Sequence, residues 1–407
     1  MLDVSRDSLH VSVGHVVQRI CSEIQFLCKK GSLQSPGSLL FLDEIQATPH
    51  ALAALRYFHE EMPELPVISA GSLLEFTLAK HNFSMPVGRV EYLFLGPLTF
   101  TEFVEAKGEK ELIQLMNSFS FEEPFPESAH NQLRELLRSF LLIGGMPEVV
   151  SSYLQNHDHQ EPINIQSSIL ETYQDDFSKY CTDSQLLMVQ KVFDKIPQLI
   201  GSKIKYVNID SDAQSRVIKT ALQLLIKAGI LTKVNHTDAN GIPLKAEADD
   251  KVYKPYFLDC GLMNRSCRVD WISSDEMLNA KFINEGNLAE QFIAQHLLTL
   301  ERENESPKLH YWLREKKSKN SEVDFVVQSN QSIIPIEVKA GKSGSLRSLN
   351  QFMNTKKAML AMRFDLNLPS IQKVQHKVRN SEGGEDKVNY QLISLPLYMV
   401  EQHRRFI

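Results

Sequence analysis

The segment SLLFLDEIQATPHALAALRYFHEEMPELPVISAGS, residues 38–72, decides the fold class. Its apolar run at 38–42 is too short for a helix, and this predicts a strand buried on both faces of a parallel sheet. A second apolar run lies at 66–72, and residues 53–65 between them have helical spacing. Strand, crossover helix and strand form the unit of a parallel α/β layer. We therefore expect an α/β domain at the start of the chain.

The composition is that of a folded protein with more than one domain. The 407 residues are 43% hydrophobic and 23% charged, which predicts two or three domains with their own cores. The sequence has no long uncharged apolar run, no signal-peptide pattern, and five cysteines without a CxxC pair. We therefore expect a cytoplasmic protein that does not enter a membrane and holds reduced thiols rather than zinc.

Three domains are expected: residues 1–105, a helical region at 106–270, and a β-rich region at 271–407. The helical region is expected to end in a winged helix-turn-helix, because a helix at 213–228, capped by Asp212, precedes two short apolar strands. The expected strands are 230–234 and 252–258, and the expected buried side of the helix comprises Val217, Leu222, Leu224, Leu225 and Ala228.

A local basic patch coincides with this helix, although the chain as a whole has a net charge of −6. A basic helix face is typical of a helix that contacts DNA, and it also occurs on a helix that packs on its neighbours and leaves its charges in water. DNA is therefore a candidate partner. The basic residues, with no acidic residue between 213 and 236, are Arg216, Lys219, Lys227 and Lys233.

The segment SEVDFVVQSNQSIIPIEVKAG, residues 321–341, predicts a β-hairpin. A tight turn in its polar centre places Asp324 opposite Glu337 and Glu322 opposite Lys339. Period-two alternation separates these polar residues from an apolar set that we expect on the buried face. The apolar set is Val323, Phe325, Val327, Ile334, Ile336 and Val338.

Two carboxylates opposed at about 5 Å destabilise a sheet unless a cation lies between them. The two opposed acids with Lys339 nearby suit Mg²⁺, which would polarise a phosphodiester while the lysine positions or activates a water. This D-x(12)-E-x-K spacing resembles the PD-(D/E)xK nuclease superfamily. There an acid on the preceding helix often joins the metal site, here Glu290 or, as the alternative, Glu285. In the competing interpretation, Lys339 only forms a salt bridge with Glu322.

A second pair of acids ends the first predicted strand, and SLLFLDEIQ resembles the Walker B element of P-loop ATPases. In that element the first acid, Asp43, holds Mg²⁺ through water, and Glu44 orients the attacking water. Ser72, after the next strand, is the candidate sensor of the γ-phosphate. Arg89 is a candidate nucleotide contact, in its own chain or in a second copy. Alternatively, the acids cap a helix and Arg89 is structural.

The Gly-rich loop that a nucleotide site needs is absent from the sequence upstream of Asp43. The pattern G-x-x-x-x-G-K-[ST] supplies the backbone amides that cradle phosphates, and residues 1–42 do not contain it. Binding of ATP to this chain is therefore doubtful.

Several long motifs occur in one order and together resemble a family of prokaryotic AAA-type ATPases with a C-terminal domain of unknown function. The resemblance covers roughly residues 14–352. It implies an N-terminal P-loop ATPase domain that is truncated here, a helical and winged-helix middle, and a restriction-endonuclease-like end. The motifs are FLDEIQATPHALAALRYFHEEMPELPVISAGSLLEF, PVGRVEYLFLGPLTFTEF, GGMPEVV, YFLDCGL and EVDFVVQ with IPIEVKAG.

The missing loop leads to two expectations: a misassigned start or a truncated relic. The sheet would then have an unpaired strand that a partner could complete. Three functions compete: an ATPase that couples nucleotide state to nucleic-acid binding, a Mg²⁺-dependent nuclease that acts without ATP, and a non-catalytic DNA-binding or assembly protein. We expect the first as the family identity.

Overall fold

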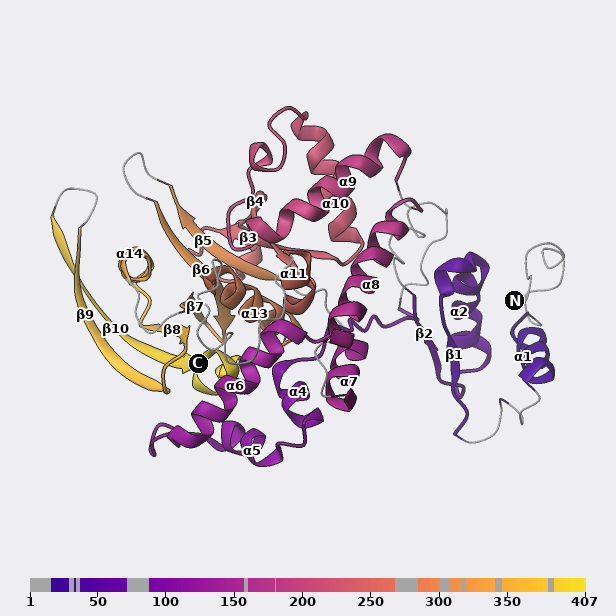
Figure 1. Ribbon diagram of the computed structural model, residues 1–407, viewed down its shortest axis with the longest axis horizontal. Coiled ribbons are helices and arrows are strands. Elements are labelled where there is room, and N and C mark those ends of the chain that lie inside the picture. Colours follow the sequence, from indigo (N-terminus) through magenta and orange to yellow (C-terminus); the bar gives the residue numbers. More distant parts are fainter. Residues whose placement is uncertain are drawn as a thin grey trace. The chain divides into compact units, whose positions relative to one another are not determined.

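The structure is a computed structural model that describes residues 16–28, 33, 37–71, 88–156, 160–179, 181–267, 285–300, 308–315, 320–340, 346–379 and 384–407. The chain divides into two compact units (Figure 1). The first is Met1–Leu93 with Lys227–Gly229, and the second is Phe94–Ile226 with Ile230–Ile407. The boundary expected at 270 lies inside the second unit.

The first unit contains the predicted strand, crossover helix and strand. Strands β1 (Leu40–Leu42) and β2 (Val67–Ser69) pair in parallel, and helix α2 (Pro49–Glu61) connects them after the short helix η2 (Ile45–Ala47). Helix α1 (Val16–Cys28) precedes them. The parallel α/β prediction is thus confirmed for these elements.

The core of the first unit lies on one side of the two strands. Val17 and Cys21 of α1 pack with Leu40 of β1 and with residues of α2. Phe41 is 55% exposed and Ile68 is 45% exposed. The prediction that both faces of these strands are buried is therefore wrong for the described residues, because the side chains that alternate with Leu40 point away from this core.

The second unit begins with helices, as the apolar spacing between 110 and 200 predicts (Figure 1). Residues of α4, α6 and α13 join in one aromatic cluster in which Phe100, Phe140 and Phe292 meet edge to face. The elements are α4 (Phe100–Ala106), α5 (Lys110–Ser118), α6 (Glu127–Ile143), α7 (Pro147–Asn156), α8 (Gln160–Phe177), α9 (Asp183–Lys195), η3 (Ile196–Leu199) and η4 (Tyr206–Asn208).

The predicted basic helix is α10 (Ser215–Lys227), which starts two residues later than expected. Asp212 does not cap it; the Asp210 carboxylate instead accepts hydrogen bonds from the backbone N–H groups of residues 212 and 213. The buried residues are Ile218, Ala221, Leu222 and Leu225. Leu222 and Leu225 are buried as expected, but Val217 is 38% exposed because Ile218 faces the core in its place, and Leu224 and Ala228 are half-buried.

The two strands expected as a wing are β3 (Leu231–Thr237) and β4 (Ala248–Phe257), and they pair antiparallel. They do not stand apart as a wing, because β3 also pairs in parallel with β5 (Leu309–Arg314). Both strands therefore belong to a sheet that continues into the C-terminal part of the chain.

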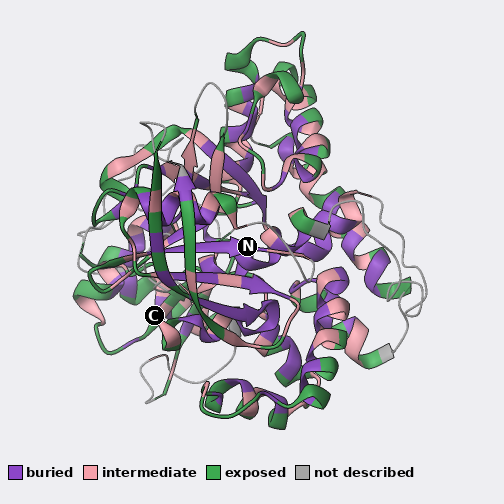
Figure 2. Cartoon of the chain, turned by 90° about the vertical axis from the view of Figure 1, so that its left-hand side faces the viewer, coloured by how far each residue is buried: buried purple, intermediate pink, exposed green. Residues whose placement is uncertain are grey.

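This sheet has eight strands in the order β4-β3-β5-β6-β7-β8-β10-β9. Its central strands are mostly buried, whereas the edge strand β9 is mostly exposed (Figure 2). Helix α13 contacts β4, β5 and β7, and α14 contacts β6, β7, β9 and β10. The remaining elements are β6 (Ser321–Ser329), β7 (Ser332–Val338), β8 (Leu360–Asp365), β9 (Ser370–Arg379), β10 (Glu385–Pro396), η5 (Leu244–Glu247), α11 (Cys260–Ser266), α13 (Glu285–Thr299), α14 (Arg347–Lys356) and η6 (Leu397–Phe406).

Among the helices of the described ranges, none has both the length and the apolar content needed to cross a bilayer.

Candidate functional site

The hairpin β6–β7 has the register that the sequence predicts. Phe325 pairs with Ile336, and the pairing continues to a two-residue turn in which Asn330 has a φ of +52°. The next position along this register brings together Asp324 and Glu337. Local alternation and turn chemistry are therefore sufficient to place these two acids next to each other.

The face that carries the acids is buried as well. Asp324 is 8% exposed and Glu337 is 4% exposed, because the hairpin lies between β5 and β8 in the middle of the sheet. Of the six apolar residues expected to be buried, Val327 alone is half-buried. The acids consequently lie in a medium where an unbalanced charge is costly.

Lys339 contacts Glu337, and Asp324 bonds to the backbone between them. One oxygen of Asp324, Oδ2, accepts a hydrogen bond of 2.8 Å from the backbone N–H of Val338. The ammonium of Lys339 donates to Glu337 Oε1 at 2.5 Å. The second carboxylate oxygen of Glu337, Oε2, is buried and has no hydrogen-bond partner in the described part of the chain. A buried carboxylate oxygen without a donor calls for a cation or a water.

Lys254 of β4 enters the same cluster, and sequence reasoning missed it. Its side chain is 0% exposed, and its ammonium lies 2.5 Å from Glu322, 3.5 Å from Glu290 and 3.9 Å from Asp324. The ammonium also lies 5.2 Å from the ring centre of Tyr311. Four elements, β4, β5, β6 and α13, therefore converge on one buried lysine.

The competing interpretation, a salt bridge between Lys339 and Glu322, is wrong. Lys339 pairs with Glu337, and Glu322 pairs with Lys254. The sequence signal for Lys254 is a single lysine inside the apolar strand VYKPYFL at 252–258. Such a lysine is rarely fully buried unless it has acidic partners.

Glu290 on α13 faces the cluster, as the nuclease resemblance implies. The Tyr256 hydroxyl donates to Glu290 Oε2 at 3.0 Å, beside the contact with Lys254. Gly201 closes the other side. Its φ is +74°, which favours glycine, and a Cβ there would lie 2.8 Å from Glu290 Oε2. The side chain of Glu285, the alternative acid, lies outside the described residues.

Two buried glutamines fix α13 against β4, the strand that carries Lys254, and against the start of α11. Gln291 accepts from the N–H of Phe257 and donates to its carbonyl, each at 2.8 Å. Gln295 accepts from the N–H of Cys260 at 2.9 Å. The Gln291 side chain bonds to both backbone groups of Phe257, as a neighbouring strand would. Because Glu290 precedes Gln291 on α13, these bonds hold Glu290 at a fixed distance from β4.

The cluster has too little positive charge for its carboxylates. Burial and then the charge of Asp324 raise the pKa of Glu337 to about 8, in spite of Lys339. Burial also raises the pKa of Glu290 to about 8, although Lys254 opposes the rise. For Lys254, burial lowers the pKa, but the surrounding carboxylates outweigh burial and raise it above its usual value. A further cation would stabilise the ionised acids.

The donor set fits one Mg²⁺. No three His, Cys, Asp or Glu side chains within the described ranges converge as a metal-binding group. Mg²⁺, however, keeps several waters and is commonly held by one or two carboxylates together with substrate phosphates. Asp324 and Glu337 supply two carboxylates, and within the described ranges Glu337 Oε2 has no hydrogen-bond partner.

In the first unit, Asp43 and Glu44 are exposed and follow directly after β1. The N–H of Ala70, after β2, donates to the carbonyl of Leu42, and the N–H of Ile45 donates to the carbonyl of Ala70. The acids thus lie where two parallel strands end, the edge at which α/β sheets bind ligands. Neither acid caps α2 or η2 through its side chain.

The other two residues predicted to bind nucleotide are less informative. Arg89 forms an ion pair of 2.8 Å with Glu60, which also binds Arg56. These contacts agree with the structural alternative for Arg89. Ser72 lies outside the described residues.

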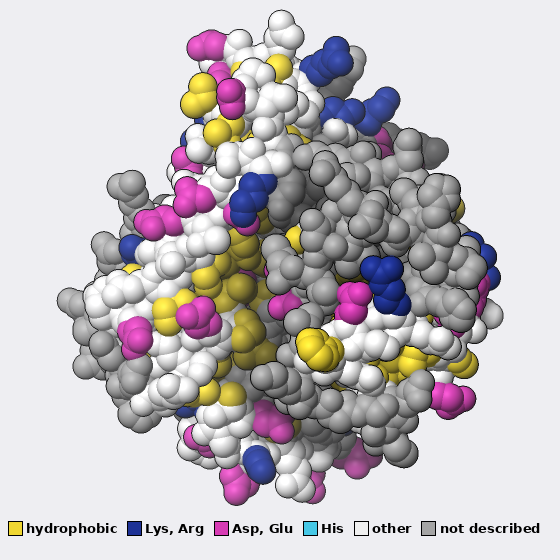
Figure 3. All heavy atoms as spheres, turned by 90° about the vertical axis from the view of Figure 1, so that its right-hand side faces the viewer, with side chains coloured by type: hydrophobic (Ala, Val, Ile, Leu, Met, Phe, Trp, Pro, Cys, Tyr) yellow, Lys and Arg dark blue, Asp and Glu magenta, His cyan; other side chains and the backbone are white. Residues whose placement is uncertain are grey.

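The predicted basic patch is only partly exposed. Arg216, Lys219 and Lys227 are exposed on α10. Lys233 instead lies over the ring of Tyr253 at 4.8 Å and donates to a backbone carbonyl of the neighbouring strand. On the face drawn in Figure 3, the Lys and Arg side chains are dispersed among Asp and Glu.

Comparison with protein families matches three consecutive parts of the chain. A model described as an AAA domain matches residues 12–104. Over these residues the chain is therefore similar to an AAA domain. Two models described as domains of unknown function, DUF8612 and DUF4143, match residues 134–272 and 285–378. Neither the curated proteins nor the solved structures contain a match.

The AAA-type resemblance is thereby confirmed at the level of the domains. The restriction-endonuclease-like character of the C-terminal part stays a prediction, because a match to a domain of unknown function carries no activity.

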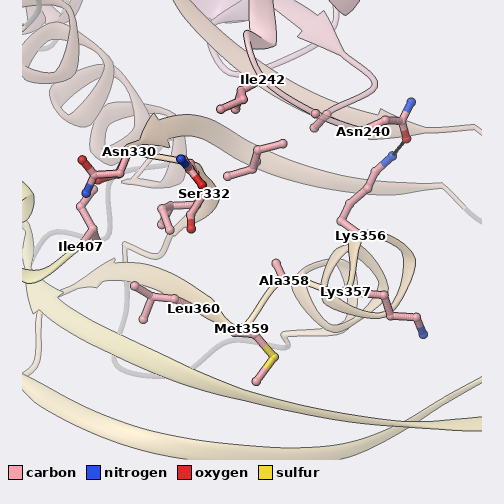
Figure 4. Close-up of a pocket in the computed structure, with 16 residues that line it drawn as sticks. Asn240, Ile242, Asn330, Ser332, Lys356, Lys357, Ala358, Met359, Leu360 and Ile407 are labelled. Carbon is pink, nitrogen blue, oxygen red and sulfur yellow. Dashed lines mark hydrogen bonds between the residues drawn. The ribbon is translucent and has the colours of Figure 1, made fainter.

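The second unit also has a cavity of about 450 Å³ away from Asp324 and Glu337 (Figure 4). It is lined by the β6–β7 turn, by the end of α14 and by the loop that contains Asn240. Lys356 in its wall donates to Asn240 at 2.6 Å. None of the residues predicted from the sequence to form a site lines it.

Proposed function

We propose that this AAA-type protein hydrolyses phosphodiester bonds of nucleic acid with Mg²⁺ held by Asp324 and Glu337. The observation that carries the proposal is the buried oxygen Glu337 Oε2, which lacks a hydrogen-bond partner among the described residues. It lies in a cluster whose acids outnumber its lysines. When its acids are ionised, the cluster carries more negative charge than its two lysines balance, and a divalent cation would offset that charge.

Each residue has a task that follows from its contacts. When bound, Mg²⁺ would supply a Lewis acid that polarises the phosphoryl oxygen. Asp324 is oriented by the N–H of Val338. Lys339, bound to Glu337 Oε1, offers positive charge and further N–H donors to a phosphate oxygen or to a water. Glu290, fixed through α13, completes the acidic wall.

The test is nicking of supercoiled plasmid by the full chain, with Mg²⁺ and with EDTA. We expect Mg²⁺-dependent nicking that falls by about 100-fold or more in Asp324→Asn and Lys339→Met. Glu385→Gln, on an exposed position of β10, is the control and should keep the wild-type rate. A pure wild-type preparation without Mg²⁺-dependent nicking would overturn the proposal.

A second candidate function is coupling of nucleotide state to nucleic-acid binding. It is favoured by the AAA match and by Asp43 and Glu44 at the ends of parallel strands. Because the 407 residues hold no G-x-x-x-x-G-K-[ST] loop, we expect them to bind ATP more weakly than micromolar. Micromolar binding that disappears in Asp43→Ala would contradict this expectation.

A third candidate, a non-catalytic DNA-binding protein, is favoured by Lys254, which neutralises part of the acidic cluster from within. It predicts salt-sensitive DNA binding without turnover. Arg216→Ala and Lys219→Ala should then weaken binding, because both side chains are exposed on α10.

A further inference from the structure

We infer that Lys254 supplies, from within the protein, the positive charge that a second metal ion would bring, so that the site takes one divalent cation and not two. The inference rests on the proposed metal site at Asp324 and Glu337. It concerns the number of ions, which the sequence pattern does not determine.

The position of Lys254 supports this role. Its ammonium is within 4 Å of carboxylates on two different elements, Glu290 on α13 and both Glu322 and Asp324 on β6. Hard cations such as Mg²⁺ select carboxylate oxygens gathered from separate elements in the same way. The ammonium thus stands where a second cation would find its ligands.

The carboxylates of the cluster are divided between its two lysines, and the oxygens that remain are enough for a single ion. Lys254 contacts Glu290 and Glu322, and Lys339 contacts Glu337 Oε1. Glu337 Oε2, next to Asp324 in the hairpin, has no partner among the residues that the structure describes. One ion at these two residues would satisfy that oxygen, whereas a second ion would have to displace Lys254.

Displacement of Lys254 is blocked by the packing around it. The side chain is 0% exposed and lies beside the Tyr311 ring. The helix that carries Glu290 is tied to the strand of Lys254 through Gln291. Displacing the ammonium would separate it from its carboxylates, and an isolated buried ammonium is strongly disfavoured.

The experiment counts bound Mn²⁺ per full chain by equilibrium dialysis with metal analysis, and follows the melting temperature with and without Mn²⁺. We expect one ion in the wild type and two in Lys254→Met, which keeps the length of the side chain and removes its charge. Mn²⁺ should also raise the melting temperature of Lys254→Met more than that of the wild type. Lys377→Met, on the exposed strand β9, is the control and should bind one ion.

Each outcome decides the inference. Two ions in the wild type, or equal numbers in the wild type and Lys254→Met, overturn it. One ion in both proteins would leave the proposed metal site standing. No ion in the wild type and one in Lys254→Met would overturn the proposed function and, with it, the inference of one ion in the wild type. If Lys254→Met does not fold, Lys254→Gln, which can still donate to Glu322, takes its place with the same expected numbers.

Discussion

Replacing Glu337 by glutamine should stabilise the protein, and the gain should grow with pH. The pKa of Glu337 is raised from 4.5 to about 8 in the folded chain, mainly by burial. A carboxyl with a raised pKa in the folded state binds its proton more tightly there than in the unfolded state. The fold therefore loses stability as the pH rises from 4.5 towards 8.

The magnitude follows from about 1.4 kcal/mol per pKa unit. Ionisation of Glu337 costs the fold nothing at pH 4 and at most about 5 kcal/mol at pH 9. Glutamine keeps the shape of the protonated acid and does not ionise. The variant should thus melt at the wild-type temperature at pH 4 and clearly above it at pH 9.

The assay is thermal unfolding in EDTA across this pH range. Glu385→Gln, whose side chain is 56% exposed, is the matched control and should follow the wild type throughout. Mg²⁺ added at pH 9 should raise the melting temperature of the wild type but not that of Glu337→Gln. A gain that does not change with pH, or a loss of stability at pH 9, would refute the reasoning.

Three further predictions concern the supports of the site. Lys254→Met should lower the free energy of unfolding by about 3–5 kcal/mol, because it leaves buried acids unpaired; denaturant titration of the second unit checks this. Asp259→Ala should cost at least about 2 kcal/mol, since the carboxylate accepts from the backbone N–H groups of Gly145 and Leu262, and Asp259→Asn should cost less in the same titration. Burial lowers the pKa of His296, and that of His403 to about 4. The unfolded chain therefore gains protons first, and the melting temperature should fall as the pH drops below about 6.5.

The sequence predicts the part of the site that is formed by residues close together in the chain. Turn chemistry and period-two alternation place Asp324 against Glu337. Lys254 was missed because its position depends on β3 pairing with β5, across more than seventy residues of sequence. No local pattern encodes such a pairing.

The errors have the same origin. Phe41 belongs to an apolar run typical of a strand buried on both faces, yet it is exposed, because burial depends on which elements cover the sheet. Val217 was predicted to lie on the buried side of α10, but it is exposed. Which residues of a helix are buried depends on the elements that pack against it, and these are not evident from the helix sequence alone.

The pairing of β3 with β5 also affects how this protein can be divided. One domain match ends at residue 272 and the next begins at residue 285, which suggests two separable modules. The sheet runs across that junction, and the acidic cluster takes Lys254 from one side and Glu290, Asp324 and Glu337 from the other. A fragment cut there would lose both a strand partner and the internal counter-ion of the acids. The two stretches of sequence on either side of this junction therefore have to be kept in one fragment for the sheet and the cluster to form.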